Sequence, residues 1–265
     1  MAKTEAMPKT TLGRFVWYDL MTNDPAAAQE FYPKVTGWKT QSWEGAEQPY
    51  TMWTRGETPI GGVMSLPPNV QAPPHWLTYI ATPDIERTVK QAQQLGGKVK
   101  HPVTPIPTVG KFAVLQDPQG AYFAAFEPDE GTSGEWNPQP GDVSWNELVT
   151  SDWQGAWKFY HELFGWEKTS TMDMGPGNAY QMYGEKGSER SYGGMYNFQK
   201  DMPPMPPNWL PYIRVKNLDA TIEQVRKLGG QVLNGPMEVP GGDRVAQCMD
   251  PQGAAFALHE AAKTG

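Results

Sequence analysis

Two stretches of the chain, residues 13–38 and 141–166, read GRFVWYDLMTNDPAAAQEFYPKVTGW and GDVSWNELVTSDWQGAWKFYHELFGW. They align without a gap, and because Trp17 matches Trp145 the offset is 145 − 17 = 128 residues. The matched positions also pair Asp19 with Glu147 and the dipeptide Phe-Tyr at 31–32 with the same dipeptide at 159–160. Self-similarity over this length predicts that one folding unit occurs twice.

A second set of matches extends the repeat to most of the chain. Residues 75–80, HWLTYI, match residues 208–213, NWLPYI, at an offset of 209 − 76 = 133. The tetrapeptide Asp-Pro-Gln-Gly at 117–120 recurs at 250–253 with the same offset. We therefore predict a first domain over residues 13–127, a second over 141–260, and between them a linker over 128–140, which is rich in Pro, Gly and Glu.

Each half contains two similar modules of one strand, one helix and three further strands. In the first module a strand-like run over 15–21 precedes Asp24, an N-cap residue followed by Pro25, and Gly37 is placed to end the helix. The order restarts at His75, with a helix expected over 85–95 and a last strand over 121–126. The sequence thus predicts an α+β fold built from four βαβββ modules in two pairs.

Charge and composition exclude several classes of function. The 265 residues carry 22 Lys and Arg against 29 Asp and Glu, a net charge of −7, without the clustered basic residues that nucleic acid binding requires. The single Cys248 excludes an intrachain disulfide and a cysteine-based zinc cluster. No apolar run reaches the ~18 residues of a membrane span, and the first residues do not resemble a secretory signal. We expect a cytoplasmic protein with neither a nucleic acid nor a membrane as partner.

The repeated motifs resemble those of the vicinal oxygen chelate superfamily, which includes glyoxalase I, bleomycin-resistance proteins and extradiol dioxygenases. The motifs are D-x-x-x-A-x-x-F-Y-x-x-x-x-G-W at 24–38 and 152–166, the Leu-Gly-Gly helix ends, and Asp-Pro-x-Gly before the last strand. The resemblance implies that each pair of modules forms an incomplete barrel with its helices outside. It also implies that the functional site lies on the concave face of that barrel.

The metal ligands of this superfamily are His, Gln or Glu at the first and last strands, and this chain departs from that pattern. The corresponding positions hold Trp, Leu and Ala in both halves: Trp17, Leu77 and Ala124, then Trp145, Leu210 and Ala257. Because these side chains cannot coordinate a divalent cation, we expect no metal ligands and no cofactor. An alignment shifted by one or two residues would leave a divalent metal as the alternative.

Alternation along the strands predicts which side chains face the two cavities. We expect Asp19, Glu147 and His259 as catalytic candidates, because carboxylates and imidazole transfer protons. The expected ligand-binding residues are aromatic, apart from one anion-binding arginine: Trp17, Tyr79, Phe126, Trp145, Tyr212 and Arg214. The first cavity is then largely aromatic, and the second combines acid, base and cation.

A structural interpretation stands beside each of these assignments. Glu147 and Arg214 could form an ion pair, His259 could cap the last strand, and the two tryptophans could belong to the core. Cys248 fits a buried apolar cysteine better than a nucleophile. The sequence alone leaves these alternatives open.

The predicted function is the binding of a small aromatic or anionic organic molecule, with metal-independent lyase or isomerase chemistry by general acid–base catalysis. One alternative is a binding protein that sequesters its ligand, as bleomycin-resistance proteins do. Another is a divalent-metal-dependent lyase or dioxygenase. Four modules can complete two sites within one chain, so we expect a monomer or a homodimer.

Overall fold

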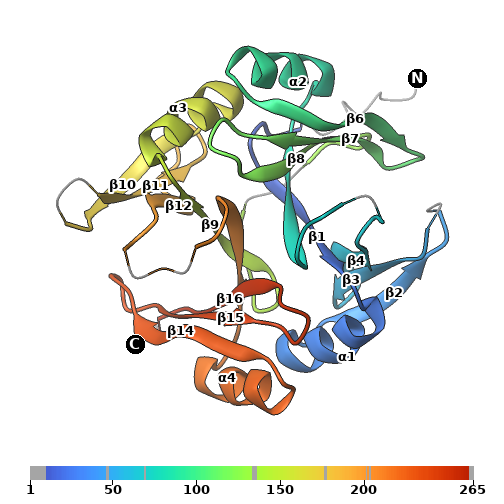
Figure 1. Ribbon diagram of the computed structural model, residues 1–265, viewed down its shortest axis with the longest axis vertical. Helices are drawn as coiled ribbons and strands as arrows, with labels where there is room; N and C mark the ends of the chain where they lie inside the picture. Colours follow the sequence, from blue (N-terminus) through green and yellow to red (C-terminus); the bar gives the residue numbers. More distant parts are fainter. Residues whose placement is uncertain are drawn as a thin grey trace, which may run out of the picture. The chain divides into compact units, whose positions relative to one another are not determined.

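The computed structural model describes residues 10–45, 48–68, 70–132, 136–175, 178–200, 202 and 204–262. Residues 133–135 of the predicted linker lie outside this part of the chain. The elements of the first half are β1 (Phe15–Thr22), α1 (Pro25–Thr36), β2 (Lys39–Trp43), β3 (Tyr50–Arg55), β4 (Thr58–Ser65), β5 (His75–Ala81), α2 (Ile85–Gln94), β6 (Lys98–Ile106), β7 (Gly110–Gln116) and β8 (Tyr122–Pro128) (Figure 1). Those of the second half are β9 (Val143–Thr150), α3 (Trp153–Phe164), β10 (Glu167–Asp173), β11 (Ala179–Gly184), β12 (Ser191–Asn197), β13 (Asn208–Arg214), α4 (Leu218–Lys227), β14 (Gln231–Glu238), β15 (Arg244–Met249) and β16 (Ala255–Glu260).

The strands form two eight-stranded mixed sheets of the same topology. The first has the order β2-β3-β4-β1-β5-β8-β7-β6, and the second has the order β10-β11-β12-β9-β13-β16-β15-β14. In each βαβββ module the last strand lies beside the first. The pairs β1–β4, β5–β8 and β13–β16 are parallel. The predicted α+β fold of tandem paired modules is confirmed.

The helices begin and end where the local sequence predicts. The Asp24 side chain accepts a hydrogen bond from Ala27 N at the start of α1, and Gly37 ends the helix with a left-handed φ of 79°. Helix α3 repeats this arrangement with Asp152 and Gly165. Side-chain caps satisfy amides that the first turn of a helix leaves unpaired, and glycine adopts a positive φ without steric strain.

The chain packs as two compact units that do not follow the repeat. Unit 1 comprises Met1–Val16, Thr78–Trp136 and Leu148–Trp209, and unit 2 comprises Trp17–Leu77, Asn137–Glu147 and Leu210–Gly265. Helix α1 therefore packs with α4 in unit 2, and α2 packs with α3 in unit 1 (Figure 1). Each unit combines one module from the first half of the chain with one from the second.

The core of unit 2 is built around Tyr32 of α1. Its hydroxyl donates to Asp250 Oδ2 at 3.0 Å and accepts from Trp76 Nε1 at 3.2 Å. Its ring packs against Trp38 and Phe256, with centroids 6.0 and 5.4 Å away. The repeated Phe-Tyr motif of one half thus binds the repeated Asp-Pro-Gln-Gly turn of the other.

The core of unit 1 contains the same arrangement with the halves exchanged. Tyr160 of α3 donates to Asp117 Oδ2 at 3.0 Å and accepts from Trp209 Nε1 at 3.1 Å. The buried Asp117 Oδ1 also accepts hydrogen bonds from three backbone amides of its own turn. These buried contacts explain why both motifs occur in both halves.

None of the helices that the structure describes is long and apolar enough to span a membrane.

Candidate functional site

The helices cover one face of each sheet, and the opposite, inner face carries the candidate functional side chains. Phe256 of β16 contacts Phe31 of α1, with ring centroids 6.0 Å apart, and so faces the helices. Because side chains alternate along a strand, its neighbour Ala257 faces inward. Ala257 packs there with Leu210, Tyr212, Trp145 and Val245.

Unit 2 holds a hydrogen-bonded triangle on β1 and β3 of the first sheet. Trp17 Nε1 donates to Asp19 Oδ1 at 2.9 Å and to Tyr50 Oη at 2.8 Å. The Tyr50 hydroxyl in turn donates to the same Asp19 oxygen at 2.6 Å. The structure therefore brings together the two predicted residues, Trp17 and Asp19, and adds Tyr50.

Burial shapes the chemistry of this triangle. Asp19 is only 4% exposed, and burial together with the Asp19 charge raises the pKa of Tyr50. The phenol therefore stays protonated and donates to the carboxylate. The Tyr50 ring can lie there because Gly62 of β4, the register partner of Asp19, has no side chain: a Cβ at Gly62 would lie 2.0 Å from Tyr50 Oη.

Unit 2 also contains the equivalent carboxylate of the second half, Glu147 of β9. Gln247 Nε2 of β15 lies 3.1 Å from Glu147 Oε1 and 3.1 Å from Tyr212 Oη. Glu147 is 5% exposed, and the inner-face cluster described above, to which Tyr212 belongs, is apolar. A carboxylate held by an amide in such surroundings can accept a proton or a hydrogen bond from a ligand.

His259 and Arg214, the other polar residues expected beside Glu147, bond elsewhere in unit 2. His259 Nδ1 lies 2.7 Å from Ser144 Oγ, and His259 Nε2 lies 2.8 Å from Asp243 Oδ2. The Arg214 guanidinium donates to the Pro138 carbonyl. The predicted set of Glu147, Tyr212, His259 and Arg214 is therefore divided into separate hydrogen-bonded groups.

The aromatic residues predicted for the first cavity are divided: Trp17 belongs to unit 2, whereas Tyr79 and Phe126 form a cluster in unit 1. The Tyr79 ring lies 6.4 Å from Phe126 and 6.1 Å from Phe112, centroid to centroid. The exposed His101 ring stacks on Phe112 at 5.2 Å with an interplanar angle of 13°. This aromatic cluster, Tyr79, His101, Phe112 and Phe126, can pack against a planar ligand.

The residues present do not fit a metal ion. Within the described part of the chain, no three His, Cys, Asp or Glu side chains gather closely enough to hold one. Trp145, Leu210 and Ala257, which hold the ligand positions predicted for the second half, pack together on the inner face. The acidic side chains next to them are engaged by Trp, Tyr and Gln donors.

Six residues of these groups were not predicted from the sequence as site residues: Tyr50, His101, Phe112, Ser144, Asp243 and Gln247. A signal existed for Tyr50, because Tyr50 and Tyr180 follow the two helices at similar distances, as Gly62 and Gly194 do. A Cβ at Gly194 would lie 2.0 Å from the Tyr180 ring, so the tyrosine–glycine contact is also repeated.

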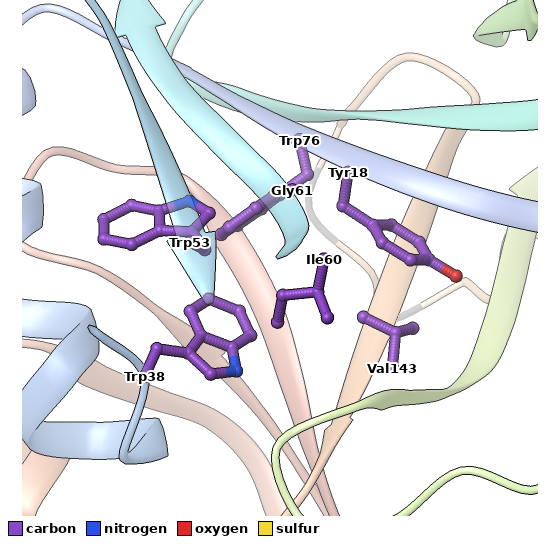
Figure 2. A pocket seen from close by; sticks show the side chains of 7 residues that line it. All are labelled: Tyr18, Trp38, Trp53, Ile60, Gly61, Trp76 and Val143. Carbon is purple, nitrogen blue, oxygen red and sulfur yellow. The ribbon is translucent and has the colours of Figure 1, made fainter. Parts of the chain in front are cut away.

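Unit 2 also contains an apolar crevice on the helix side of the first sheet. It has an empty volume of about 150 Å³ that leaves no space for a water molecule, and Figure 2 shows the side chains that line it: Tyr18, Trp38, Trp53, Ile60, Gly61, Trp76 and Val143. Trp53 Nε1 is buried there without a hydrogen-bond partner in the described part of the chain. We assign this crevice to core packing, because it is too narrow for a ligand.

Comparison with known proteins places this geometry in a family. The model described as "Glyoxalase/Bleomycin resistance protein/Dioxygenase superfamily" matches residues 14–124 and 143–258. A protein of Mycobacterium tuberculosis named "Putative glyoxylase CFP32" is 31% identical over 246 residues, which cover 91% of this chain and 92% of the relative. The "Anthracycline biosynthesis protein DnrV" of Streptomyces peucetius is 29% identical over 279 residues, which cover 96% and 95%.

Solved structures share the fold at low sequence identity. The Mn(II)-bound glyoxalase from Novosphingobium aromaticivorans has a TM-score of 0.63 at 15% identity, covering 96% of this chain and 83% of that chain. The 2,3-dioxygenase LapB from a Pseudomonas species has a TM-score of 0.65 at 14% identity, covering 97% and 94%. These similarities concern the fold alone.

Proposed function

Because the chain belongs to the glyoxalase/bleomycin resistance protein/dioxygenase superfamily, we propose that it binds a small aromatic or anionic organic molecule on the inner faces of its sheets. We further propose that Glu147 acts on this molecule as a general base, in a lyase or isomerase reaction that needs no metal. The reaction class is removal of a proton from a carbon next to a carbonyl group.

The observation that carries this proposal is the position of the Glu147 carboxylate. It is nearly buried, it lies beside apolar inner-face side chains, and Gln247 Nε2 fixes one of its oxygens at 3.1 Å. A carboxylate held in place beside apolar side chains can take a proton from a ligand that packs against it. The amide bridge from Gln247 to Tyr212 orients the group without neutralising it.

The names of the relatives and the side chains at the predicted metal-ligand positions support the same proposal. One relative is named for a glyoxylase and another for anthracycline biosynthesis. Ligands of the usual superfamily metal site are replaced in both halves by side chains that cannot coordinate. A base supplied by the chain itself is then the simplest source of proton transfer.

A second candidate function is binding without catalysis, and the aromatic cluster of unit 1 favours it. Stacking on Tyr79, Phe112 and His101 requires shape and π-contacts but no base. The two sheets can serve both functions, since their inner faces carry different chemistry. A cytoplasmic location and a monomeric or homodimeric state stay predictions.

The variant Glu147→Gln distinguishes catalysis from binding alone. The probe is 2-hydroxyacetophenone, an aromatic α-hydroxyketone. Calorimetry measures binding, and NMR measures exchange of the probe's α-proton with D2O. We expect binding within about threefold of wild type and exchange slowed about 100-fold or more. Glu86→Gln, on the exposed face of α2, is the matched control. Binding without exchange in either protein supports sequestration and removes Glu147 as a base.

Elemental analysis of the purified protein tests whether the chain binds a metal. We expect Zn, Ni, Mn and Fe each at well below one equivalent per chain. A stoichiometric metal that survives dialysis against a chelator would overturn the metal-independent reaction.

A further inference from the structure

Ser144, His259 and Asp243 form a hydrogen-bonded relay in unit 2, apart from the Glu147 group. Ser144 Oγ lies 2.7 Å from His259 Nδ1, and His259 Nε2 lies 2.8 Å from Asp243 Oδ2. The other oxygen of Asp243 accepts from Ala262 N at 2.7 Å, which orients the carboxylate. Three strands or their ends supply the relay: β9, β16 and the turn before β15.

The hydrogen atoms of the relay can be assigned from the chemistry of its groups. An ionised carboxylate only accepts, so Nε2 carries the hydrogen that is donated to Asp243. In neutral imidazole Nδ1 then accepts, and the Ser144 hydroxyl donates to it at 2.7 Å. The Ser144 hydroxyl also lies near the Tyr212 carbonyl oxygen, at the longer distance of 3.3 Å. The serine is therefore bonded to a base that a carboxylate orients.

The fold does not require this relay, because the first sheet reaches the same strand order without it. At the offsets of 128 and 133 residues, Ser144 corresponds to Val16, His259 to Phe126 and Asp243 to Gly110. The first sheet has the same strand order with these three residues. The three polar residues are thus specific to the second half and occur there together.

We propose that Ser144, His259 and Asp243 form an acyl-transfer site, with Ser144 as the nucleophile. A serine, a base within hydrogen-bond reach and a group that orients the base are the parts that such a site needs. The roles of the two imidazole nitrogens are exchanged relative to the usual arrangement, which does not change the direction of proton transfer.

The proposed ester hydrolysis needs no cofactor, because each bond that breaks is matched by one that forms. Ser144 Oγ forms a bond to the carbonyl carbon of an ester while its proton passes to His259 Nδ1. The bond to the leaving alcohol then breaks, and the alcohol leaves with that proton. Water repeats the sequence on the acyl-serine, gives its proton to Nδ1, and releases a carboxylic acid while Ser144 recovers its hydrogen.

The surroundings select small acyl groups. Ser144 is 5% exposed, whereas the side chains of His259 and Asp243 are 14% and 39% exposed, so a substrate approaches from the imidazole side. Val245 lies opposite His259 in the β15–β16 pair and belongs to the apolar inner-face cluster. Short-chain esters of uncharged alcohols or phenols fit this environment.

The test uses the full-length protein with phenylmethanesulfonyl fluoride and p-nitrophenyl acetate. We expect one sulfonyl adduct per chain, located at Ser144 by peptide mass spectrometry, and ester hydrolysis that the reagent abolishes. Ser144→Ala removes both. Asp243→Asn is expected to slow labelling and ester hydrolysis about 100-fold, because it removes the carboxylate that orients the His259 ring.

The controls separate activation from exposure and from misfolding. Ser151, an exposed serine just after the same strand, is expected to stay unlabelled. His259→Phe introduces the residue of the first half and should keep the wild-type circular dichroism spectrum and melting temperature within a few degrees. The proposal would be overturned if Ser151 and Ser144 were labelled equally, or if Ser144 did not react in a folded protein. Either result would show that these hydrogen bonds only stabilise the packing of the strands.

Discussion

At the scale of single residues, Gly62 and Gly194 make room for the tyrosines that cross the inner faces. A Cβ at Gly62 would lie 2.0 Å from Tyr50 Oη and 2.2 Å from its Cζ, so the ring must move away from Asp19. We expect Gly62→Ala to lower the free energy of unfolding by about 1–3 kcal/mol. Urea denaturation measures it, and the double variant with Tyr50→Ala should cost less than the sum of the two single changes. Additive losses would contradict a direct clash.

A second residue-scale prediction concerns the buried turn carboxylates, Asp117 and Asp250. Burial raises the pKa of both in the folded chain, against the hydrogen bonds that they accept. A raised folded pKa gives a stabilising contribution that is full below the unfolded pKa of about 3.9 and is lost as the pH rises through the folded value. The stability of wild type relative to Asp250→Asn should therefore increase as the pH falls from neutrality toward about 4. Urea titrations at several pH values measure the difference, and a constant or decreasing difference would contradict the shift.

At the scale of elements, the two helices α1 and α3 depend on matched caps. Asp24 and Asp152 each accept from the third residue of their helix at 3.0 Å. We expect Asp24→Ala and Asp152→Ala each to cost about 1 kcal/mol of unfolding free energy, measured by thermal denaturation. Asp24→Asn and Asp152→Asn, which keep the acceptor oxygen, are the controls. An unequal response of the two helices to the same change would show that packing dominates over capping.

These local elements are also what could be predicted from the sequence. Caps, helix ends and the alternation of β1 depend on neighbours in the chain, so the helix bounds and the pairing of Trp17 with Asp19 followed from nearby residues. Gln247 is different, since it meets Glu147 100 positions away in sequence. Its inward position depends on the register of β15 against β16, where it lies opposite Ala257. The bulges in the neighbouring β14–β15 pair show that spacing alone does not fix such registers.

At the scale of the whole molecule, the motifs that reveal the duplication also join the two halves. Tyr32 binds Asp250 across 218 residues, and Tyr160 binds Asp117 across 43. Trp38 Nε1 donates to the Gly141 carbonyl at 2.6 Å, and Trp166 Nε1 donates to that of Gly13 at 2.8 Å. Similar sequences predict two domains, and the packing places one module of each half in each compact unit. A repeat identifies equivalent modules but does not say which of them pack together.

This packing predicts that neither half folds alone. Residues 1–134 and 135–265, produced separately, should each lack near-ultraviolet circular dichroism and a cooperative thermal transition. Mixed and refolded together, they should recover both signals, because each supplies the tyrosine or the aspartate that the other half needs. Independent folding of either half to a cooperative state would contradict the arrangement of the cores.

The central claim, also at the scale of the molecule, is that a chain with the superfamily fold uses Glu147 in place of a metal. Its most direct test is α-proton exchange of 2-hydroxyacetophenone in D2O, followed by NMR before and after exhaustive dialysis against a chelator. We predict the same exchange rate in both samples and a rate about 100-fold lower in Glu147→Gln. Exchange that disappears with the chelator and returns with added Zn, Ni, Mn or Fe would contradict the claim.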